Sequence, residues 1–431
     1  MGCTRRELVR AGALGLAGSV LAACSGTSAR GGAPSTGAAS VAQPETLASN
    51  ARKPVVFYNR QPLDDEGAPD LEVLGWNDAT YYVGADADEG GRLQGQMVLE
   101  HLKAHAATLD RNGDHVIGYV LAIGDLTHAD ALARTRGVRQ ALGTAVEHDG
   151  VVLADPVGTN EDGASAVVRD GVLEVADVTY TIRELASREM RNADGVPWDH
   201  ETARAALDEW VAALGDRIDV VVCNNDGMAV ELFDHWARRE GVATFGYDGT
   251  PDAVAAVGEG LAGTITQNSS VQAYLTLRLL RNALDGVDPQ TGIATADARG
   301  NVLPAESYRY DAETRSFYVA NTVITAHGYQ DHLKEARALE AVGSALDETS
   351  SPRKRVWLSI YRAADDYLDG MYQPLLALYD DLLNLDVDYI GGDGEDDDNV
   401  LARLARADEY DAYAINLVAT HNARAYLQRL A

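Results

Sequence analysis

Polar residues that stand directly after apolar runs are the part of this sequence best suited to chemistry. The carboxyl ends of parallel strands share one edge of a sheet, so such residues would meet in space. Taken singly, each is more often a helix cap or a turn residue. Five such places in one chain favour a shared binding site instead. They are Asn59 after PVVFY, Asn225 and Asp226 after VVVCN, Asp248 after FGY, Gln267 after TIT, and Asp365 after a strand and a short loop.

The elements that would position these residues alternate along the chain from Pro54 onward. Strands are expected at 54–58, 81–84, 116–123, 217–223, 243–247, 263–266, 356–360 and 412–417, and helices at 130–148, 228–239, 251–259, 271–284 and 367–385. Strands alternating with helices of this length predict an α/β fold with parallel sheets covered by helices. Residues 155–190 break the pattern and are expected to form an irregular or hairpin-like insertion.

Length and composition narrow the class of protein. The chain has 431 residues, enough for two ordinary domains, and 46% of them are apolar, which is too many for a disordered chain. The formal net charge of −30 argues against a nucleic-acid partner, because DNA and RNA require a basic surface. Three cysteines make no disulfide framework, and Cys223 in an apolar strand is expected to be a buried hydrophobic residue.

The first residues have the pattern of an export signal. Arginines precede a short run of small apolar residues that ends in Leu21-Ala22-Ala23-Cys24. We therefore interpret residues 1–23 as a signal peptide, too short to span a membrane as a helix. The end of this run resembles a bacterial lipobox, which implies that Cys24 is lipidated; an ordinary signal peptide with an incidental cysteine is the alternative. Residues 24–53 are rich in Ser, Gly and Ala and predict a flexible tether.

Ten sequence segments resemble the periplasmic galactose/glucose-binding proteins, which are type I periplasmic sugar-binding proteins. Eight lie in the family's order, and the two that open the family's sequence lie instead at the end of this chain. The resemblance therefore implies a circularly permuted member. In order, the eight are PVVFYNRQP (54–62), YYVGAD (81–86), LDRNGDHVIGYVLAIGD (109–125), HADALART (128–135), VPWD (196–199), IDVVVCNNDGMA (218–229), FGYDGTPDAV (245–254) and LAGTITQN (261–268); the two are KRVWLSIYRAADDY (354–367) and DAYAINLV (411–418).

The family's fold implies two doubly wound Rossmann-like lobes joined by a hinge of three crossovers. Lobe 1 would comprise residues 54–86, 268–320 and 354–431. Lobe 2 would comprise residues 87–267 and 321–335. Residues 336–353 would be a linker that joins the ancestral termini.

Seven polar residues match the family's sugar-bonding positions in residue type. A hexose presents hydroxyls that both donate and accept, and charged side chains give the stronger hydrogen bonds. The resemblance implies that Asp365 accepts from the hydroxyl at carbon 4, where glucose and galactose differ. It also implies that Asp130 and Arg134 serve the anomeric and ring-oxygen end. The seven are Asn59, His128, Asp130, Arg134, Asn225, Asp248 and Asp365.

Two aromatic residues and one amide complete the implied sugar site. Trp198 and Tyr367 stand at the family's stacking positions, where the family usually has phenylalanine in place of Tyr367. Gln267 replaces a family asparagine. From the residues alone, Trp198 beside Pro197 would more often belong to a core. A general-base role for His128 is the alternative to simple hydrogen bonding, but no nucleophile stands beside it in the sequence.

An acidic loop has the 1-3-5 spacing of oxygen ligands found in EF-hand-type calcium sites. The resemblance implies a calcium site made of Asp110, Asn112, Asp114, the carbonyl of Val116, and Asp219. Asp219 replaces a family glutamate, Gly118 replaces a glutamine, and His115 occupies the sixth loop position, where EF-hands have glycine. An empty, solvated acidic turn is the alternative.

The leading interpretation is a monomeric, membrane-anchored lipoprotein that faces the periplasm or the cell exterior and is not an enzyme. It would capture D-glucose or D-galactose and deliver the sugar to an ABC permease. A sensor of the same fold, read by a membrane receptor, is an alternative, as is a pentose or another monosaccharide as ligand. A hydrolase that uses Asp130 and Asp248 is a third reading, but the familiar enzyme motifs are absent from the sequence.

Overall fold

The computed structural model describes residues 47–50, 52–163, 165–293, 307–330, 332, 351–361, 367–391, 397–405 and 407–431. The predicted signal peptide (1–23), Cys24, most of the predicted tether and linker, and Asp365 lie outside the described residues. Among the helices described, none is long and apolar enough to cross a membrane.

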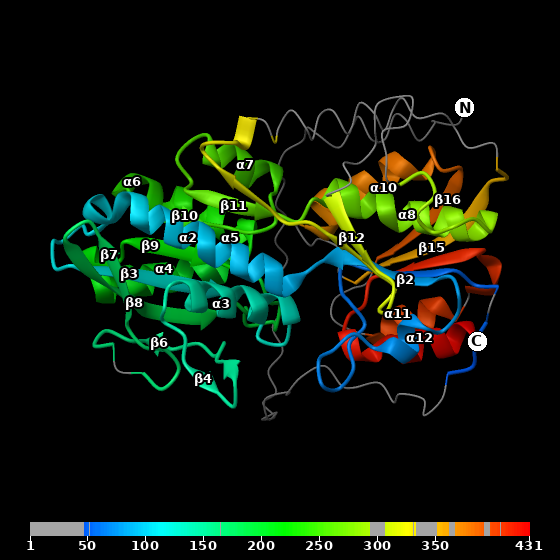
Figure 1. The fold of residues 1–431 in the computed structure, drawn as a ribbon, viewed down its shortest axis with the longest axis horizontal. Helices are drawn as coiled ribbons and strands as arrows, with labels where there is room; N and C mark the ends of the chain where they lie inside the picture. Colours follow the sequence, from blue (N-terminus) through cyan, green and yellow to red (C-terminus); the bar gives the residue numbers. More distant parts are fainter. Residues whose placement is uncertain are drawn as a thin grey trace, which may run out of the picture. The chain divides into compact units, whose positions relative to one another are not determined.

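The described strands of the first sheet run in the spatial order β12-β13-β2-β1-β17-β15-β16 (Figure 1). Neighbours pair in parallel, except that β12 and β13 form an antiparallel hairpin at one edge. The strands are β1 (Val55–Tyr58), β2 (Thr80–Ala85), β12 (Tyr308–Asp311), β13 (Ser316–Val319), β15 (Lys354–Ile360), β16 (Leu385–Gly391) and β17 (Ala412–Ile415). The last strand of the chain thus pairs with the first: Val56 of β1 lies opposite Ala414 of β17.

Helices cover both faces of the first sheet, as a parallel sheet requires. α8 (Ser269–Asp285) and α10 (Gln373–Asp380) pack together on one face, and α1 (Leu71–Leu74), α11 (Asp397–Leu404) and α12 (Ala423–Leu430) lie on the other (Figure 1). The helix predicted for 367–385 is wrong in extent. A π-helical turn (Leu368–Tyr372) precedes α10, which ends at Asp380, and β16 begins at Leu385, because the alternating apolar residues of LDVDYIG suit a strand.

The second sheet has the order β14-β11-β10-β9-β3-β8-β6, with β7 paired to β8. Its central strands, from β11 to β8, are parallel. The strands are β3 (Val116–Ile123), β6 (Gly158–Thr159), β7 (Gly171–Val175), β8 (Val178–Glu189), β9 (Val220–Cys223), β10 (Ala243–Phe245), β11 (Gly263–Thr266) and β14 (Thr322–Thr325). β4 (Glu147–His148) and β5 (Val151–Val152) form a separate hairpin.

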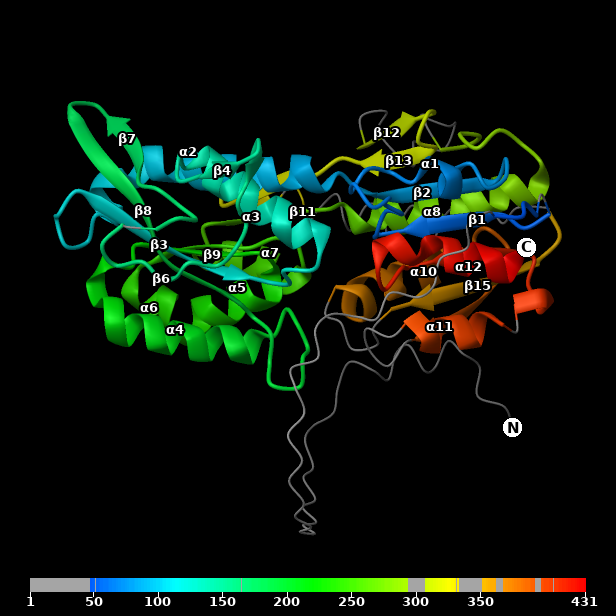
Figure 2. The same cartoon turned by 90° about the horizontal axis from the view of Figure 1, so that it is seen from below.

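The helices of the second sheet also form two layers. α2 (Ala87–Leu109) and α3 (Ala129–Ala141) pack on one face, and α4 (His200–Leu214) and α5 (Asp226–Leu232) on the other, as Figure 2 shows. α5 continues through a π-helical segment (Phe233–Ala237) into α6 (Arg238–Glu240), and α7 (Pro251–Val257) follows β10. Alternate residues of β3 supply the two cores: Tyr119 and Leu121 face α2 and α3, whereas Val120 faces α4.

Glycines let α2 and α3 cross closely. A Cβ added to Gly137 of α3 would lie 2.1 Å from the backbone of Gly91 of α2, a distance that no side chain tolerates. α2 was missed as an element by the sequence analysis, since its 23 residues include three glycines and many polar residues.

Two predictions for the second sheet are corrected by the structure. The helix predicted for 130–148 ends at Ala141, and residues 147–148 form β4, because Gly143 adopts a left-handed φ of 73° that stops the helix. Residues 155–190 are not wholly an insertion. β8, within this segment, is a strand of the main sheet that pairs along the whole of β3, and only β6, β7 and their loops are additions at its edge.

The described chain passes between the two sheets at three places. These are the junction of β2 and α2 near Asp86, the junction of β11 and α8 near Asn268, and the junction of β13 and β14 near Asn321. β14 of the second sheet is followed along the chain by β15 of the first, so a further crossing runs through 326–353, most of which lies outside the described residues. No described strand belongs to both sheets.

A fully buried ion pair fixes the edge of the second sheet. The Arg139 guanidinium on α3 lies 2.7 Å and 2.9 Å from the two Glu184 oxygens on β8, and neither side chain is exposed. The same guanidinium donates to the carbonyls of Leu153 and Asp155, which follow the β4–β5 hairpin.

We predict that Arg139→Met lowers the free energy of unfolding by about 3–5 kcal/mol, because it leaves the Glu184 carboxylate buried without its cation. Arg183→Met is the matched control: it removes the ion pair with Asp170 on the partly exposed side of the same strand and should cost less than about 1 kcal/mol. Urea denaturation measures both values. Equal losses in the two variants would contradict this account of the buried pair.

Candidate functional site

The polar residues predicted to meet at a sheet edge do so in the second sheet. β3, β9, β10 and β11 are neighbouring parallel strands, so their carboxyl ends lie on one edge. His128, Asn225, Asp248 and Gln267 stand in the segments that leave these four strands. The structure therefore brings together one predicted side chain from the end of each strand.

Arg134 on α3 is the centre of this group. Its Nη1 donates to the carbonyl of Asn224 at 2.7 Å and lies 3.5 Å from Asp248 Oδ1, and its Nη2 lies 3.5 Å from Asp130 Oδ2. The guanidinium also stacks on the ring of Tyr247, 3.6 Å from its centroid. Burial opposes its charge, but the neighbouring Asp248, Tyr247 and Asp130 outweigh it and raise the pKa of Arg134. The cation is thus permanent and faces two carboxylates.

Gln267 holds Asp248 in place. Its Nε2 donates to Asp248 Oδ1 at 2.7 Å, and both side chains are buried. Asp248 has a φ of 120°, a conformation rare for a residue with a side chain, which indicates a constrained position at the end of β10. Burial raises the pKa of Asp130, although Arg134 and Arg60 oppose the rise.

His128 and Trp198 form the wall beside these charges. His128 caps α3 by accepting from the Asp130 backbone N–H at its Nδ1, 3.1 Å away, which places the proton of the neutral ring on Nε2. Burial lowers the pKa of His128 well below its usual value, and the cations Arg60 and Arg134 add to the effect. The Trp198 ring stands edge-on to the imidazole, with the centroids 5.6 Å apart.

Trp198 depends on a glycine for its position. A Cβ added to Gly124, just after β3, would lie 2.0 Å from the indole ring. Trp198 itself has a left-handed φ of 60° and donates its backbone N–H to the Gly124 carbonyl. The large ring therefore packs directly against the backbone at the end of β3.

Asn225 is a helix cap, as its position after a strand most often implies. Its Oδ1 accepts from the Met228 backbone N–H at 3.0 Å at the start of α5. This contact occupies one lone pair of the side-chain oxygen, and the described contacts leave its amide N–H groups for another acceptor.

Two predicted residues belong to the first sheet, and the resemblance implies a third beside them. Asn59 directly follows β1 with a left-handed φ of 64°, and its backbone bonds to Val83 and to the Tyr82 hydroxyl. The hydroxyl of buried Tyr367 accepts from Ser269, the first residue of α8. Asp365, the third, lies outside the described residues.

Arg60 is a further candidate that the sequence analysis missed. It is only 7% exposed, stacks on Tyr361 with its guanidinium carbon 3.9 Å from the ring centroid, and donates from Nη1 to the carbonyl of Val418. Its Nε and Nη2 have no hydrogen-bond partner within the described part of the chain. Its position directly after Asn59, at the end of a buried strand, was the available signal.

Together these groups can recognise an uncharged, hydroxyl-rich molecule. They present carboxylates as acceptors, guanidinium, imidazole and amide N–H groups as donors, and an indole face for apolar C–H groups. The Arg60 donors that have no partner among the described residues are buried, so water does not readily satisfy them, and a ligand oxygen would.

The predicted calcium loop connects α2 to β3. The side-chain oxygens of Asp110 and Asn112 accept from the Asp114 backbone N–H, and Asp114 accepts from Val116. His115, at the sixth position, has the left-handed φ of 60° for which glycine is usual. Asp219 accepts from the Gly118 and Arg111 backbone N–H groups.

The residues of this loop fit calcium in part. All the predicted ligands are oxygens, the donor type that calcium prefers. Burial raises the pKa of Asp219 to about 7, and the Asp110 carboxylate adds to the rise. Within the described ranges, however, no three His, Cys, Asp or Glu side chains are grouped so as to hold a metal ion.

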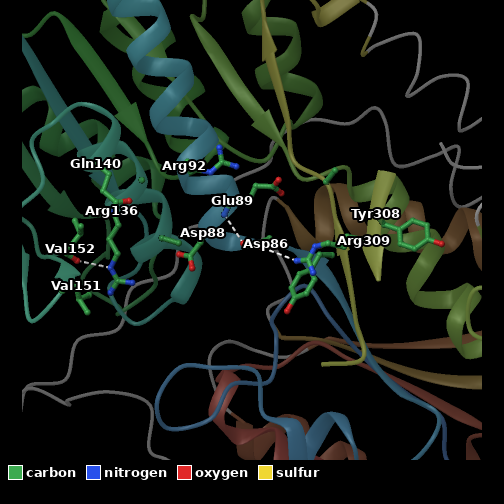
Figure 3. Close-up of a pocket in the computed structure, with 15 residues that line it drawn as sticks. Asp86, Asp88, Glu89, Arg92, Arg136, Gln140, Val151, Val152, Tyr308 and Arg309 are labelled. Atoms are coloured by element: carbon green, nitrogen blue, oxygen red, sulfur yellow. Dashed lines mark hydrogen bonds and ion pairs between the residues drawn. The ribbon is translucent and has the colours of Figure 1, made fainter. Parts of the chain in front are cut away.

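A cavity of about 800 Å³ lies elsewhere, beside two of the crossings between the sheets (Figure 3). Its walls carry both signs of charge, from Asp86, Asp88 and Glu89 at the start of α2 and from Arg92, Arg136 and Arg309. None of the predicted sugar-contacting residues lines it. It is therefore separate from the group around Arg134.

Comparison with known families gives two matches to this chain. Residues 38–288 match a family described as a periplasmic binding protein domain. Residues 353–423 match a second family with the same description. The longer match covers more than half of the chain.

Individual relatives are more distant. The D-galactose/methyl-galactoside binding periplasmic protein MglB of Haemophilus influenzae is 28% identical over 246 residues, which are 56% of this chain and 59% of that protein. The xylitol-binding protein of Mycolicibacterium smegmatis is 27% identical over 144 residues, 33% of this chain and 39% of that protein. The chain thus spans less than two thirds of the length of either relative.

Among solved structures, an ABC transporter periplasmic solute binding protein from Actinobacillus succinogenes with bound D-allose is similar to this chain. The two share 18% sequence identity with a TM-score of 0.40, over 64% of this chain and 71% of that one.

We predict that His128 makes stability depend on pH. Its pKa is lower in the folded protein than the value of about 6.5 in an unfolded chain, so the unfolded chain binds the proton first as the pH falls. Lowering the pH from 7.5 to 5.5 should reduce the free energy of unfolding by up to about 1.4 kcal/mol through this residue. In His128→Asn, which keeps an acceptor at the cap, the free energy of unfolding should fall correspondingly less between these two pH values. Urea denaturation at both pH values measures the difference. An identical pH dependence in both proteins would contradict the assignment.

Proposed function

Because the chain belongs to the periplasmic binding protein family, we propose that it captures a monosaccharide at the polar edge of its two sheets. This is a family of solute-binding proteins and not of enzymes, and it implies export to the periplasm. The observation that carries the proposal is the buried group in which Arg134 faces Asp130 and Asp248 beside Trp198.

The group suits a sugar better than a charged ligand. Arg134 is already balanced by two carboxylates, so an anionic ligand would gain little from it, whereas hydroxyls can accept from the guanidinium and donate to the carboxylates at once. Neutral His128, with its proton on Nε2, offers one further donor. Trp198 offers a flat apolar surface to the C–H groups of a pyranose ring.

The first sheet would supply the opposite side of the ligand. We infer that Asn59, Tyr367, Arg60 and, by resemblance, Asp365 contact the sugar from there. The charges of Arg60 and Arg134 both lower the pKa of His128. A ligand that bonds to residues of both sheets would favour the closed state of a hinged protein.

We propose D-glucose or D-galactose as the ligand. The relative from Haemophilus influenzae is named for D-galactose and methyl-galactoside, which supports a hexose. A pentose or another monosaccharide is the second candidate, because Gln267 bonds to Asp248 where the galactose/glucose-binding proteins have asparagine, and because Arg60 adds a buried donor.

We further propose that the protein is a lipoprotein anchored through Cys24, and that it works as a monomer with an ABC permease. The lipobox-like end of the export signal supports the anchor, and the tether from 24 to 53 would keep the binding domain away from the membrane. A sensor that reports to a membrane receptor would have the same binding site. A permease gene or a receptor gene beside this one distinguishes the two roles.

The order of the segments supports a circular permutation. The segment matching a periplasmic binding protein domain at 353–423 follows the longer one in this chain, and β17, near the end, pairs in parallel with β1, near the start. We propose that the two lobes comprise the residue ranges given by the resemblance, with 336–353 joining the ancestral termini. The new termini of the fold would then lie before β1 and after β17, which are neighbouring strands of the first sheet.

Calcium is a further proposal for the loop after α2. Asp110, Asn112, Asp114, the Val116 carbonyl and Asp219 would hold the ion, and its positive charge would offset the carboxylates that meet there. The ion would tie the end of α2 to β3 and to the loop before β9, so its effect would be on stability.

We predict that Asp248→Asn weakens sugar binding by about ten- to a hundredfold, because it replaces a charged hydrogen bond with a neutral one while keeping the shape of the side chain. Asp252→Asn, an exposed acid on α7, is the matched control and should leave binding unchanged. Tryptophan fluorescence titrations with D-glucose, D-galactose and D-ribose measure the affinities, with Trp198→Phe to identify the reporting ring. No saturable response to any monosaccharide, checked by calorimetry, would overturn the proposed function.

We predict that calcium stabilises the folded protein, by about 2.7 kcal/mol when its concentration is a hundred times the dissociation constant. Asp114→Ala should abolish the calcium-dependent rise in melting temperature, and Asp216→Ala, an exposed acid outside the loop, should not. Thermal melts in calcium and in a chelator measure the difference. A rise that survives in Asp114→Ala would place the ion elsewhere.

A further inference from the structure

Two of the three crossings within the described residues are bonded to each other through one side chain. Asn321, at the junction of β13 and β14, donates from Nδ2 to the carbonyl of Asp86 at 3.2 Å. It also approaches the Glu89 carboxylate at 3.5 Å. Asp86 and Glu89 mark the other crossing, between β2 and α2, and Figure 3 shows both beside the cavity. Movement of one crossing therefore disturbs the other.

The same amide is bonded to the body of the second sheet. Tyr247, just after β10, donates its hydroxyl to Asn321 Oδ1 at 2.9 Å. Tyr247 is 1% exposed and Asn321 is 9% exposed, so water is largely excluded from this bond. The amide orientation is unambiguous, because its nitrogen faces a carbonyl and a carboxylate and its oxygen faces a hydroxyl.

Tyr247 is also in contact with the sugar-site cation. The guanidinium of Arg134 stacks on the Tyr247 ring, 3.6 Å from its centroid, and Arg134 faces Asp130 and Asp248. One residue thus contacts the binding site through its ring and the crossings through its hydroxyl. The path from Arg134 to Asp86 consists of direct contacts only.

A glycine makes this contact possible. A Cβ added to Gly90, in the first turn of α2, would lie 1.9 Å from the Tyr247 hydroxyl oxygen. Gly90 therefore leaves the space in which the hydroxyl reaches the crossings. The ion pair between Arg309 and Asp86, 3.7 Å apart, lies on the open side of the same region (Figure 3).

We propose that Tyr247 and Asn321 are positioning residues that couple the monosaccharide site to the hinge. The inference rests on the proposed function for its ligand, but the contacts themselves do not. A sugar that orders Arg134 also orders the Tyr247 ring, and the hydroxyl then holds both crossings in the arrangement seen here. Without the hydroxyl, the site residues remain and the hinge is free to vary.

The first test is Tyr247→Phe, which keeps the ring under Arg134 and removes only the hydroxyl. Loss of one buried neutral hydrogen bond should weaken sugar binding by about three- to tenfold. The matched control is Tyr119→Phe: its buried hydroxyl bonds to Glu184 of β8 and to Thr144 in the loop after α3, and neither partner belongs to a crossing. That variant should lower the melting temperature and leave the affinity within twofold.

Gly90→Ala tests the same contact from the other side. The new methyl group should displace the hydroxyl and weaken binding to a similar extent, although alanine favours the helix more than glycine does. In the double variant with Tyr247→Phe the closest clash is gone, so the two effects should not add. Fully additive losses would overturn the shared contact.

Distances between the sheets test the hinge without any ligand. Spin labels at Leu71→Cys on α1 and Val172→Cys on β7, both at exposed positions, report one distance distribution in the full chain with Cys3 and Cys24 replaced by Ser. Cys223 is buried and should not be labelled. The distribution should broaden in Tyr247→Phe and Gly90→Ala and stay unchanged in Tyr119→Phe.

The outcomes separate this inference from the proposed function. A broadened distribution in a protein that binds none of the monosaccharides would support the hinge coupling and overturn the proposed ligand. Weakened sugar binding with an unchanged distribution would mean that Tyr247 acts on Arg134 alone, and would overturn the coupling. An unchanged distribution with unchanged affinity would overturn it as well.

Discussion

The burial of one guanidinium governs the arrangement of this molecule's polar centre. Arg134 is 5% exposed, and a buried cation is stable only when acceptors surround it. Asp130 supplies one carboxylate from its own helix, Asp248 supplies another from the end of β10, and the Asn224 carbonyl comes from the end of β9. The ends of these elements must therefore stay in fixed positions around it, which is what a binding site requires.

The parallel sheets make that arrangement possible. Their central strands are largely apolar, with Val220, Val221 and Val222 of β9 fully buried, and the predicted sugar-contacting groups gather where the strands end. Left-handed backbone at Asn59, Trp198 and Asp248 turns these side chains at the strand ends. Such conformations cost energy, so the surrounding structure must hold these three residues in place.

The sequence predicted much of the fold and of the candidate site, and the failures have physical causes. Strands with continuous apolar runs, such as β1, β3 and β9, were predicted at nearly their observed positions, because burial on both faces leaves a strong signal. α2 was missed because glycines at its contact with α3 weaken the helical pattern. β8 was taken for part of an insertion because polar and charged residues, such as Arg183, Glu184 and Ser187, interrupt its apolar residues.

The site residues followed from strand ends together with a family resemblance, whereas Arg60 and Tyr247 did not. An arginine after a strand is usually solvated, and only the structure shows that Arg60 is buried with two nitrogens unbonded among the described residues. The role of Tyr247 depends on Gly90 and Asn321, which are far from it in sequence. Contacts between segments that are distant in sequence produce no local sequence pattern from which they could be predicted.

The central claim is that residues of both sheets hold one monosaccharide at their carboxyl edges. The most direct test is a crystal structure of the protein grown with the hexose that binds it in solution. The account predicts one sugar bonded to Arg134 and Asp248 from the second sheet and to Asn59 from the first, with its apolar face on Trp198. A sugar bound only in the cavity beside the crossings, or bonded to one sheet alone, would contradict it.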